Sequence, residues 1–212
     1  MEAVESYHDW VRHDAVYMLP QNLGRVLDFG GGVGATAARL RNDGRASFAV
    51  LFDQVADNAA PGIDAAASAN LDNIADVKRL LAQHGPFDTV LCLDILEHLN
   101  NPWDVMAAIE SAMAPGAILV VSVPNVRCYQ VVLPLVLQDR FEYKDAGVLD
   151  RTHLRWFTRK SAIALAQGPG LTVQTVRAGD MRRRDRLLNA LTFGLFERFI
   201  ALQYLVMVRK AA

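Results

Sequence analysis

The stretch VLDFGGGVGATAARL, residues 26–40, decides the fold of this chain. An apolar run ends at Phe29, and glycines follow at Gly30, Gly31, Gly32 and Gly34 before an amphipathic helical pattern begins. Glycine lets a backbone turn sharply and approach a ligand without a Cβ in the way. A plain tight turn needs only one or two glycines, so the sequence predicts a strand, a ligand-binding loop and a helix.

Two kinds of nucleotide site use such a loop. Gly30, Gly32 and Ala35 fit G-x-G-x-x-A, the dinucleotide fingerprint. With Asp28 the same stretch fits D-x-G-x-G-x-G, which resembles motif I of the class I S-adenosylmethionine-dependent methyltransferases. A carboxylate at the strand end is unfavourable beside a pyrophosphate, and it is favourable beside a ligand with an ammonium and a sulfonium group. The charge of Asp28 therefore favours the methyl donor.

The rest of the chain alternates short apolar runs with helical patterns. Several runs are almost continuously apolar, which is typical of strands covered on both faces. The predicted strands are 25–29, 47–52, 62–67, 87–93, 116–123, 171–176 and 203–208. The predicted helices are 34–42, 74–84, 102–113, 159–167 and 186–201. This order predicts one α/β domain over residues 1–212, with a mostly parallel sheet and helices on both faces.

Composition narrows the function classes. The 212 residues carry a formal net charge of −1, so a protein that holds nucleic acid chiefly by neutralising phosphates is not expected. Hydrophobic residues make up 52% of the chain, which is ample for a buried core. Cys92 and Cys128 lie in different segments and predict neither a disulfide framework nor a zinc–cysteine site. The charged N-terminus lacks an apolar signal core, so we expect a cytoplasmic protein without a membrane span.

Downstream motifs extend the resemblance over residues 20–210. GPFDTVLCLDILEHLNNPWDVMAAI, residues 85–109, is similar to the fourth strand and following helix of class I methyltransferases. APGAILVVSVPNV, residues 114–126, resembles the next strand, and QYLVMVRK, residues 203–210, resembles a last, antiparallel strand. The resemblance thus implies a Rossmann-like sheet of seven strands. SVPNV followed by LDRTHLRWFT, residues 149–158, resembles bacterial small-molecule methyltransferases associated with sugar or polysaccharide biosynthesis.

The resemblance also implies which residues hold S-adenosyl-L-methionine and its product, S-adenosyl-L-homocysteine. The glycines of the loop would pass under the methionine part and the ribose, and Asp28 would orient the loop and the methionine ammonium. Asp53 would accept hydrogen bonds from the ribose hydroxyls. The Asn70 carbonyl and the Leu71 N–H would face the adenine, with an amide where relatives carry an acid. Leu93 and Asp94 would line the methionine end of the site.

Residues 125–158 form a long apolar connection that predicts a segment on the acceptor side. Within it His153 is the first candidate for a base, because a histidine changes charge near neutral pH, and Asp150 is expected to orient it. His98, after the fourth strand, is a further catalytic candidate. Residues assigned to the small-molecule acceptor are Arg151, Asn125 and Tyr129. Asp94, Glu97 and His98 form a single polar cluster, and no metal is predicted without a second one.

Three features leave alternatives open. Residues 1–20, with Tyr7, Trp10 and Arg12, are expected to form a flap helix over the donor or a plain surface helix. The basic run Arg182, Arg183, Arg184 and Arg186 predicts a solvated loop or a contact with an anionic substrate. The apolar stretch 187–208 is expected to be a core-facing helix entering the last strand. With residues 131–138 it also offers a surface for a homodimer or for peripheral membrane contact.

Two other functions compete with methyl transfer. One is an NAD(P)-dependent oxidoreductase that uses the same glycine loop, and the other is a non-catalytic binding module with this fold. A second substrate domain and a Tyr-x-x-x-Lys pair, which would favour the oxidoreductase, are both missing from the sequence.

Overall fold

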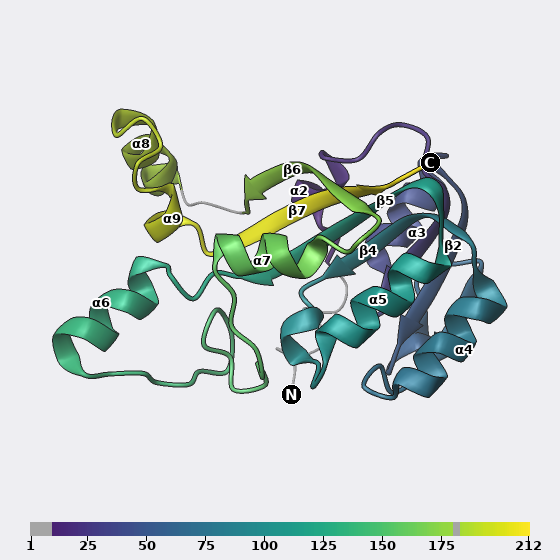
Figure 1. Cartoon of the computed structure of the whole chain (residues 1–212), viewed down its shortest axis with the longest axis horizontal. Coiled ribbons are helices and arrows are strands. Elements are labelled where there is room, and N and C mark those ends of the chain that lie inside the picture. Colours follow the sequence, from purple (N-terminus) through teal and green to yellow (C-terminus); the bar gives the residue numbers. More distant parts are fainter. Residues whose placement is uncertain (1–9, 180–182) are drawn as a thin grey trace.

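A computed structural model describes residues 10–179 and 183–212 and contains a seven-stranded sheet of order β3-β2-β1-β4-β5-β7-β6 (Figure 1). Neighbouring pairs are parallel except those that include β7, which runs antiparallel to both β5 and β6. The predicted Rossmann-like α/β sheet with an antiparallel last strand is therefore confirmed. The carboxyl ends of β1, β2, β4 and β5 meet at one edge, where open α/β sheets bind ligands.

All seven predicted strands form. They are β1 Gly24–Phe29, β2 Ala46–Asp53, β3 Ala65–Ser68, β4 Phe87–Leu93, β5 Met113–Pro124, β6 Leu171–Ala178 and β7 Gln203–Lys210. The prediction for the third strand was wrong at its start, because Gly62 (φ 114°) lies in a turn and pairing with β2 begins only at Ala65. The middle strands are buried on both faces, which explains their continuous apolar sequences.

Side-chain caps mark the starts of three helices. The helices between the strands are α3 Ala35–Asn42, α4 Ile74–His84, α5 Pro102–Ala112 and α7 Arg159–Ala166, with short turns η1 Ala56–Asn58 and η2 Leu96–His98. The Asn73 side chain caps α4, and Asn101 caps α5 one residue before Pro102. Thr158 and Ser161 form a capping box at the start of α7.

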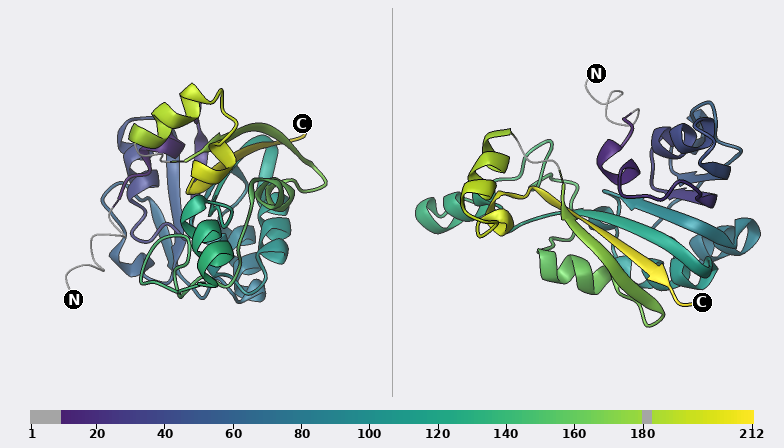
Figure 2. Two further views of the ribbon diagram at one scale, coloured as in Figure 1. Left: turned by 90° about the vertical axis from the view of Figure 1, so that its left-hand side faces the viewer. Right: turned by 90° about the horizontal axis from the view of Figure 1, so that it is seen from above.

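Helices cover both faces of the sheet, as predicted. Figure 2 shows α4, α5 and α7 on one face, whereas α3 and the short α2, His13–Val16, lie on the other. The larger core cluster lies under α4, α5 and α7, and within it Phe52 and Phe87 pack edge to face. A smaller cluster joins Ala15 and Leu40 to the other face. The predicted flap helix is seen only as α2, and Tyr7 lies outside the described residues.

Two segments extend the molecule beyond the sheet at the carboxyl end of β5 (left in Figure 1). One is the connection 125–158, which contains α6, Tyr129–Gln138, followed by a long loop. The other contains α8, Arg183–Leu191, and α9, Glu197–Ile200. The single helix predicted for 186–201 is wrong, because Phe193 (φ 52°) and Gly194 (φ 81°) break it with left-handed backbone.

The expected core-facing orientation of this helix is also wrong for most of its apolar residues. Exposed large hydrophobic side chains in α8 and the following turn are Leu187, Leu191, Phe193, Leu195 and Phe196, whereas Ile200 at the end of α9 is buried. Turn formation therefore separates an exposed apolar segment from the buried strand β7. Among the described residues, every helix is too short or too polar to cross a bilayer.

Candidate functional site

The glycine loop is folded tightly between β1 and α3. Gly30 has a φ of +74°, and its N–H donates to the carbonyl of Phe52 at 2.7 Å. A Cβ on Gly30 would lie 2.2 Å from Ile95, and one on Gly31 would lie 2.3 Å from the carboxyl carbon of Asp28. A side chain at either position would collide with its neighbour, so both positions require glycine.

Asp28 lies beneath this loop and is 1% exposed. Its Oδ2 accepts the N–H of Ala37 at 3.3 Å, which ties the end of β1 to the first turn of α3. Burial raises the pKa of Asp28 to about 7, although the Ala37 hydrogen bond lowers it, and the charge of Asp53 adds to the rise. The position favours the predicted role of orienting the loop over direct contact with a ligand above it.

Asp53, at the end of β2, holds the opposite side of the loop. Its Oδ2 accepts the N–H of Gly32 at 2.8 Å and its Oδ1 accepts the N–H of Val55 at 3.0 Å. The carboxylate is half-buried, and it therefore lies between solvent and the glycine backbone. Gly32 and Asp53 belong to separate motifs of the sequence. The parallel pairing of β1 with β2 brings them into contact.

A cavity of about 400 Å³ opens beside Asp53 and is lined by Gln54, Ser68, Ala69 and Asn70. The Asn70 Oδ1 accepts the N–H of Asp72 at 3.0 Å, so this carbonyl already forms a turn while keeping a second lone pair. Leu71 is 3% exposed and packs into the core cluster. Gln54 and Ser68 were not predicted as site residues from the sequence. The only signals for them are that Gln54 follows Asp53 and that Ser68 ends β3.

The end of β4 closes the loop from its other side. Leu93 is 9% exposed, and Asp94 adopts a left-handed φ of 55°. The Ser122 hydroxyl donates to Asp94 Oδ1 at 2.5 Å. The guanidinium of Arg12 contacts Asp94 Oδ2 and lies 2.9 Å from Asp14, while the Arg12 N–H donates to Thr36 at 3.1 Å. Arg12 thus fastens the N-terminal segment to the starts of α2 and α3 and to β4, whereas Trp10 is 71% exposed.

Next to this edge, the connection 125–158 returns to the turn η2. The carbonyl of Glu97 accepts the N–H groups of Leu154 and Arg155 at 2.8 and 3.0 Å. The rings of His98 and His153 pack edge to face, with their centres 4.7 Å apart. Burial lowers the pKa of His98, and the neighbouring His153 lowers it further. Two catalytic candidates from distant parts of the sequence therefore lie together.

Asp150 does not orient the ring of His153 as predicted. The Asp150 Oδ1 accepts the N–H and hydroxyl of Thr152 at 2.8 and 2.6 Å. Partial burial raises the pKa of Asp150, but these hydrogen bonds and the nearby histidines lower it below its ordinary value overall. The Nδ1 of His153 instead lies 3.1 Å from the carbonyl oxygen of Val148. A carbonyl only accepts, so Nδ1 carries the hydrogen and Nε2 keeps a lone pair.

Glu97 is the most unusual acid of this region. It is 1% exposed, and its Oε2 has no hydrogen-bond partner among the described residues. Burial raises the pKa of Glu97 well above its ordinary range, and the charge of Asp94 raises it further. Burying such an oxygen without a hydrogen-bond partner costs on the order of several kcal/mol. A group of this kind in a cleft is a frequent sign of function.

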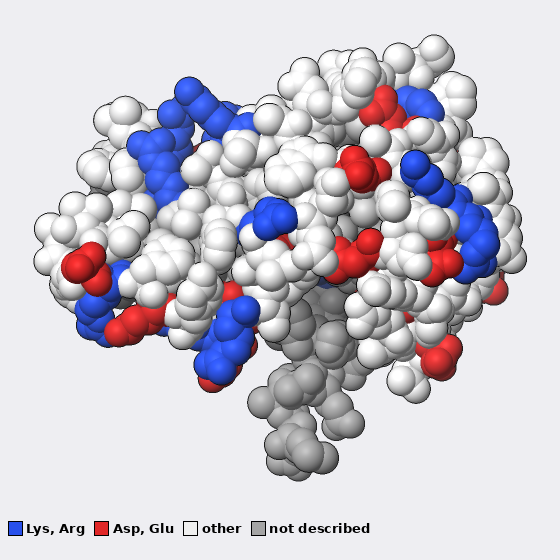
Figure 3. Space-filling view, turned by 60° about the horizontal axis from the view of Figure 1, so that its bottom comes forward, with Lys and Arg blue, Asp and Glu red and all other residues white. Residues whose placement is uncertain are grey.

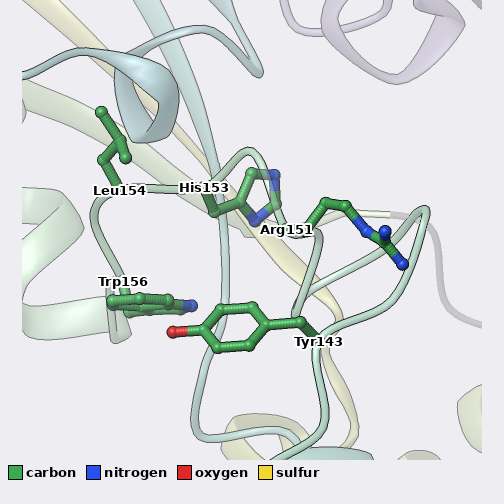
Figure 4. A pocket seen from close by; sticks show the side chains of 5 residues that line it. All are labelled: Tyr143, Arg151, His153, Leu154 and Trp156. Carbon is green, nitrogen blue, oxygen red and sulfur yellow. The ribbon is translucent and has the colours of Figure 1, made fainter.

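A second cavity, of about 470 Å³, opens in front of His153 (Figure 4). The remaining side chains around it are Tyr143, Arg151, Leu154 and Trp156. Figure 4 shows the hydroxyl of Tyr143 and the indole nitrogen of Trp156 pointing toward one another, with His153 and Arg151 above them in this view. Arg151 is exposed and pairs with Asp145 at 2.7 Å. Tyr143 and Trp156 were missed, because aromatic residues in a connection carry no spacing signal.

Two residues assigned to the acceptor lie elsewhere. Asn125 is 1% exposed, and its Nδ2 donates to the carbonyls of Arg198 and Ala201 at 3.1 and 2.8 Å. These contacts join the end of β5 to α9, which favours a structural role for Asn125. Tyr129 begins α6 and is half-buried, and it does not line the cavity in front of His153.

The two extending segments carry most of the positive charge. Residues 125–160 and 177–200 contain thirteen of the 22 lysines and arginines but seven of the 23 acids. Figure 3 shows basic side chains, mixed with acidic ones, over this left-hand end of the molecule. Part of the basic run 182–186 falls outside the described residues or has no described side chains. The near-neutral total charge therefore conceals a net positive charge in these two segments and a net negative charge in the rest of the chain.

A family model described as a methyltransferase domain matches residues 10–176. The chain belongs to the methyltransferase domain family, and its loop and sheet are those of the class I S-adenosylmethionine-dependent group. The antiparallel β7 between β5 and β6 differs from the 3-2-1-4-5-6 order of dinucleotide-binding folds. The sheet therefore disfavours the oxidoreductase alternative.

Individual relatives agree with this assignment. The chain is 30% identical over 135 residues to a tRNA 5-carboxymethoxyuridine methyltransferase of Escherichia coli K12, covering 62% of this chain and 51% of that protein. The chain thus spans about half the length of the curated relatives it matches. Among solved structures, a SAM-dependent methyltransferase from Archaeoglobus fulgidus matches with a TM-score of 0.61 and 14% identity, over 94% of this chain and 91% of that one.

A magnesium protoporphyrin IX methyltransferase from Synechocystis, solved with bound SAH, matches with a TM-score of 0.59 and 16% identity. The alignment covers 99% of this chain and 83% of that one. At these identities both likenesses concern the fold. The named acceptors of the relatives differ from one another, so the acceptor of this chain has to be argued from its own residues.

Proposed function

We propose that this chain transfers a methyl group from S-adenosylmethionine to an oxygen or nitrogen of an acceptor held in front of His153. One observation carries the proposal: Asp53 accepts the N–H of Gly32, which brings a carboxylate and a glycine backbone together at the ligand-binding edge of the sheet. When bound, S-adenosylmethionine supplies a methyl group already activated by its sulfonium. The protein therefore has to position the two ligands and exclude water.

The residues around the loop fit this donor. Asp53 has unused lone pairs for ribose hydroxyls, and the cavity beside Asn70 has room for an adenine ring. Gly30 and Gly31 are only half-buried, and neither carries a side chain that would stand between the loop backbone and a ligand. Asp94 and Arg12 offer one charge of each sign at the far end, where the methionine part carries an ammonium and a carboxylate. Each role is a prediction for this chain.

We assign the acceptor to a small molecule with a ring and an anionic group, in keeping with a sugar or glycan intermediate. Tyr143 and Trp156 offer faces on which a ring can stack, and Arg151 offers a guanidinium for a carboxylate or phosphate. The lone pair on Nε2 of His153 suits it to accept the proton of a hydroxyl or ammonium as the methyl arrives. The basic charge of residues 125–160 supports an anionic acceptor.

A tRNA nucleoside is the second candidate acceptor. It is favoured by the likeness to the Escherichia coli tRNA methyltransferase and by the same excess of lysine and arginine. The overall net charge of −1 argues against it. A nucleoside in RNA and a free sugar differ in size and in salt dependence, which makes the two candidates separable.

Transfer of a radiolabelled methyl group tests the proposal. The full chain is incubated with labelled S-adenosylmethionine and either unmodified total tRNA or a mixture of nucleotide sugars and sugar phosphates. We expect label in the small-molecule fraction, and we expect Arg151→Gln to reduce it while Arg140→Gln, at an exposed arginine paired with Glu142, does not. Label in tRNA would favour the second candidate, and label in neither fraction would count against both acceptors.

A further inference from the structure

The geometry points to a divalent metal site formed by Glu97, His98 and His153, taking a first-row transition ion such as Zn²⁺, Fe²⁺ or Mn²⁺. One ligand atom from each of the three side chains lies within 4.8 Å of the others. The sequence predicts no metal because Glu97 and His98 stand alone after β4. The fold supplies the missing partner, since residues 149–155 return to η2 and place His153 beside them.

The buried carboxylate is an independent sign of a bound cation. Glu97 is almost completely buried, and its Oε2 lacks a hydrogen-bond partner in the described part of the chain. Asp94 and Asp150 add negative charge nearby, while the guanidinium of Arg12 lies on Asp94 and Asp14. An oxygen in this position needs a donor or a cation. A metal ion between the carboxylate and the two imidazoles supplies it.

His153 is oriented as a metal ligand usually is. Its Nδ1 donates to the carbonyl of Val148, and its ring packs against the ring of His98. In metal sites the ligating histidine donates its other ring N–H to such an outer partner, which fixes the ring and its tautomer. The Val148 carbonyl lies just before the turn around Asp150. The His153 imidazole therefore keeps on Nε2 a lone pair that its outer partner does not use.

The ligand set selects the class of ion. Two imidazoles and one carboxylate are the ligands of catalytic zinc sites and of non-haem iron sites, whereas Mg²⁺ and Ca²⁺ prefer oxygen alone. Metal–ligand bonds of about 2.0–2.2 Å bring ligand atoms of one ion to about 3–4 Å from each other. Small side-chain rotations that move the ligand atoms by about an ångström would bring them from the observed spacing to this geometry.

Three protein ligands leave coordination positions open, and His153 also lines the acceptor cavity. With an ion bound, the Nε2 lone pair of His153 is a metal ligand and no longer a base. The ion would then activate the acceptor in its place, by holding an acceptor oxygen and lowering the pKa of its hydroxyl so that the proton is lost to solvent. This last role rests on the proposed methyl transfer, but the site itself does not. Metal binding and donor binding can therefore be measured separately on the same protein.

Titration with Co²⁺ tests the site on the full chain. Protein stripped with EDTA and freed of chelator is titrated with Co²⁺ while the visible absorption bands of the ion and the heat of binding are recorded. We expect one ion per chain with a spectrum of mixed nitrogen and oxygen ligation. Glu97→Gln and His153→Gln should each weaken binding by about 100-fold or more, beyond the loss typical of outer-sphere changes. His84→Gln, at a histidine at the end of α4, should bind like the parent.

Circular dichroism checks the fold of each variant, and His98→Gln, at the less buried ligand, provides a second reading if Glu97→Gln fails to fold. Absence of stoichiometric Co²⁺ binding by the parent, or parent-like binding by folded ligand variants, would overturn the site. Binding of S-adenosylhomocysteine is measured in parallel on the same protein. Co²⁺ binding without S-adenosylhomocysteine binding would refute the donor and leave the metal site, and the reverse would refute the metal site alone.

Discussion

The imidazole rings of His98 and His153 meet edge to face with their centres 4.7 Å apart, although one follows β4 and the other ends the connection from β5. This contact joins the edge of the sheet where β4 ends to the cavity lined by Arg151 and Trp156. The connection is therefore held against this edge of the sheet by the two histidines and by the carbonyl of Glu97.

His153→Ala should reduce methyl transfer by about 10²- to 10⁴-fold, the usual contribution of a general base. The affinity for S-adenosylhomocysteine should stay within about twofold of the parent, because His153 lines the acceptor cavity and not the glycine loop. Single-turnover rates and calorimetric titration separate the two effects. Parent-like turnover would remove His153 from the reaction, and a parallel loss of donor affinity would move it to the donor site.

Asp53→Asn should weaken S-adenosylhomocysteine binding by about 10- to 100-fold, because hydrogen bonds to a charged acceptor contribute about 1.5–3 kcal/mol. The amide also accepts less strongly from the N–H of Gly32, which loosens the loop. Asp43→Asn, at an exposed acid near the end of α3, is the matched control and should bind as the parent does. Equal affinity for both variants would exclude Asp53 from the ribose contact.

Asp28 should make the chain less stable as the pH rises. Its carboxyl pKa is raised from 3.8 to about 7, so between these values the folded chain retains a proton that the unfolded chain has lost. The free energy of unfolding therefore falls as pH rises from about 4 to about 7, at about 1.4 kcal/mol per unit for this group at most. Asp28→Asn should reduce this slope and be the more stable protein at pH 8.

Urea denaturation at pH 5, 6, 7 and 8 measures the effect. The slope for Asp28→Asn is subtracted from that of the parent, which removes the contribution of Glu97, another acid with a raised pKa. Identical slopes for the two proteins would show that Asp28 ionises normally in the fold.

The break between α8 and α9 can be tested through stability. Phe193 is 95% exposed and Ile200 is 7% exposed. Phe193→Ser should change the free energy of unfolding by no more than about 0.5 kcal/mol. Ile200→Ala should lower it by about 2–5 kcal/mol, because a cavity is left beneath α9. Comparable losses for both substitutions would restore the continuous core-facing helix that the sequence pattern indicates.

Much of the fold could be predicted because its signals are local. The strands β1, β4 and β5 are continuous apolar runs, and Asn73, Asn101 and Thr158 mark helix starts by their side-chain chemistry. The failed helix prediction for 186–201 has a physical cause. Apolar residues at helical spacing do not reveal whether a core lies beneath them, and Gly194, which permits the left-handed turn, does not by itself show that a helix ends there.

The site was less predictable because its contacts join distant segments. We expected Asp53 to lie close to the glycine loop and Asp28. The loop and Asp28 form one motif at the end of β1, and Asp53 ends the neighbouring strand β2. The hydrogen-bond partner of His153 could not be predicted, because the Val148 carbonyl is a backbone group and leaves no signal in the sequence. Likewise, the joining of Glu97 with His153 depends on how the connection returns to η2, which spacing along the chain does not record.

Calorimetric titration of the full chain with S-adenosylhomocysteine, and separately with NAD, tests the central claim most directly. We predict one S-adenosylhomocysteine per chain and no binding of NAD. In Gly32→Asp, a carboxylate is added at a left-handed position next to Asp53, and S-adenosylhomocysteine binding should be lost. Binding of NAD, or parent-like S-adenosylhomocysteine affinity in Gly32→Asp, would contradict the account.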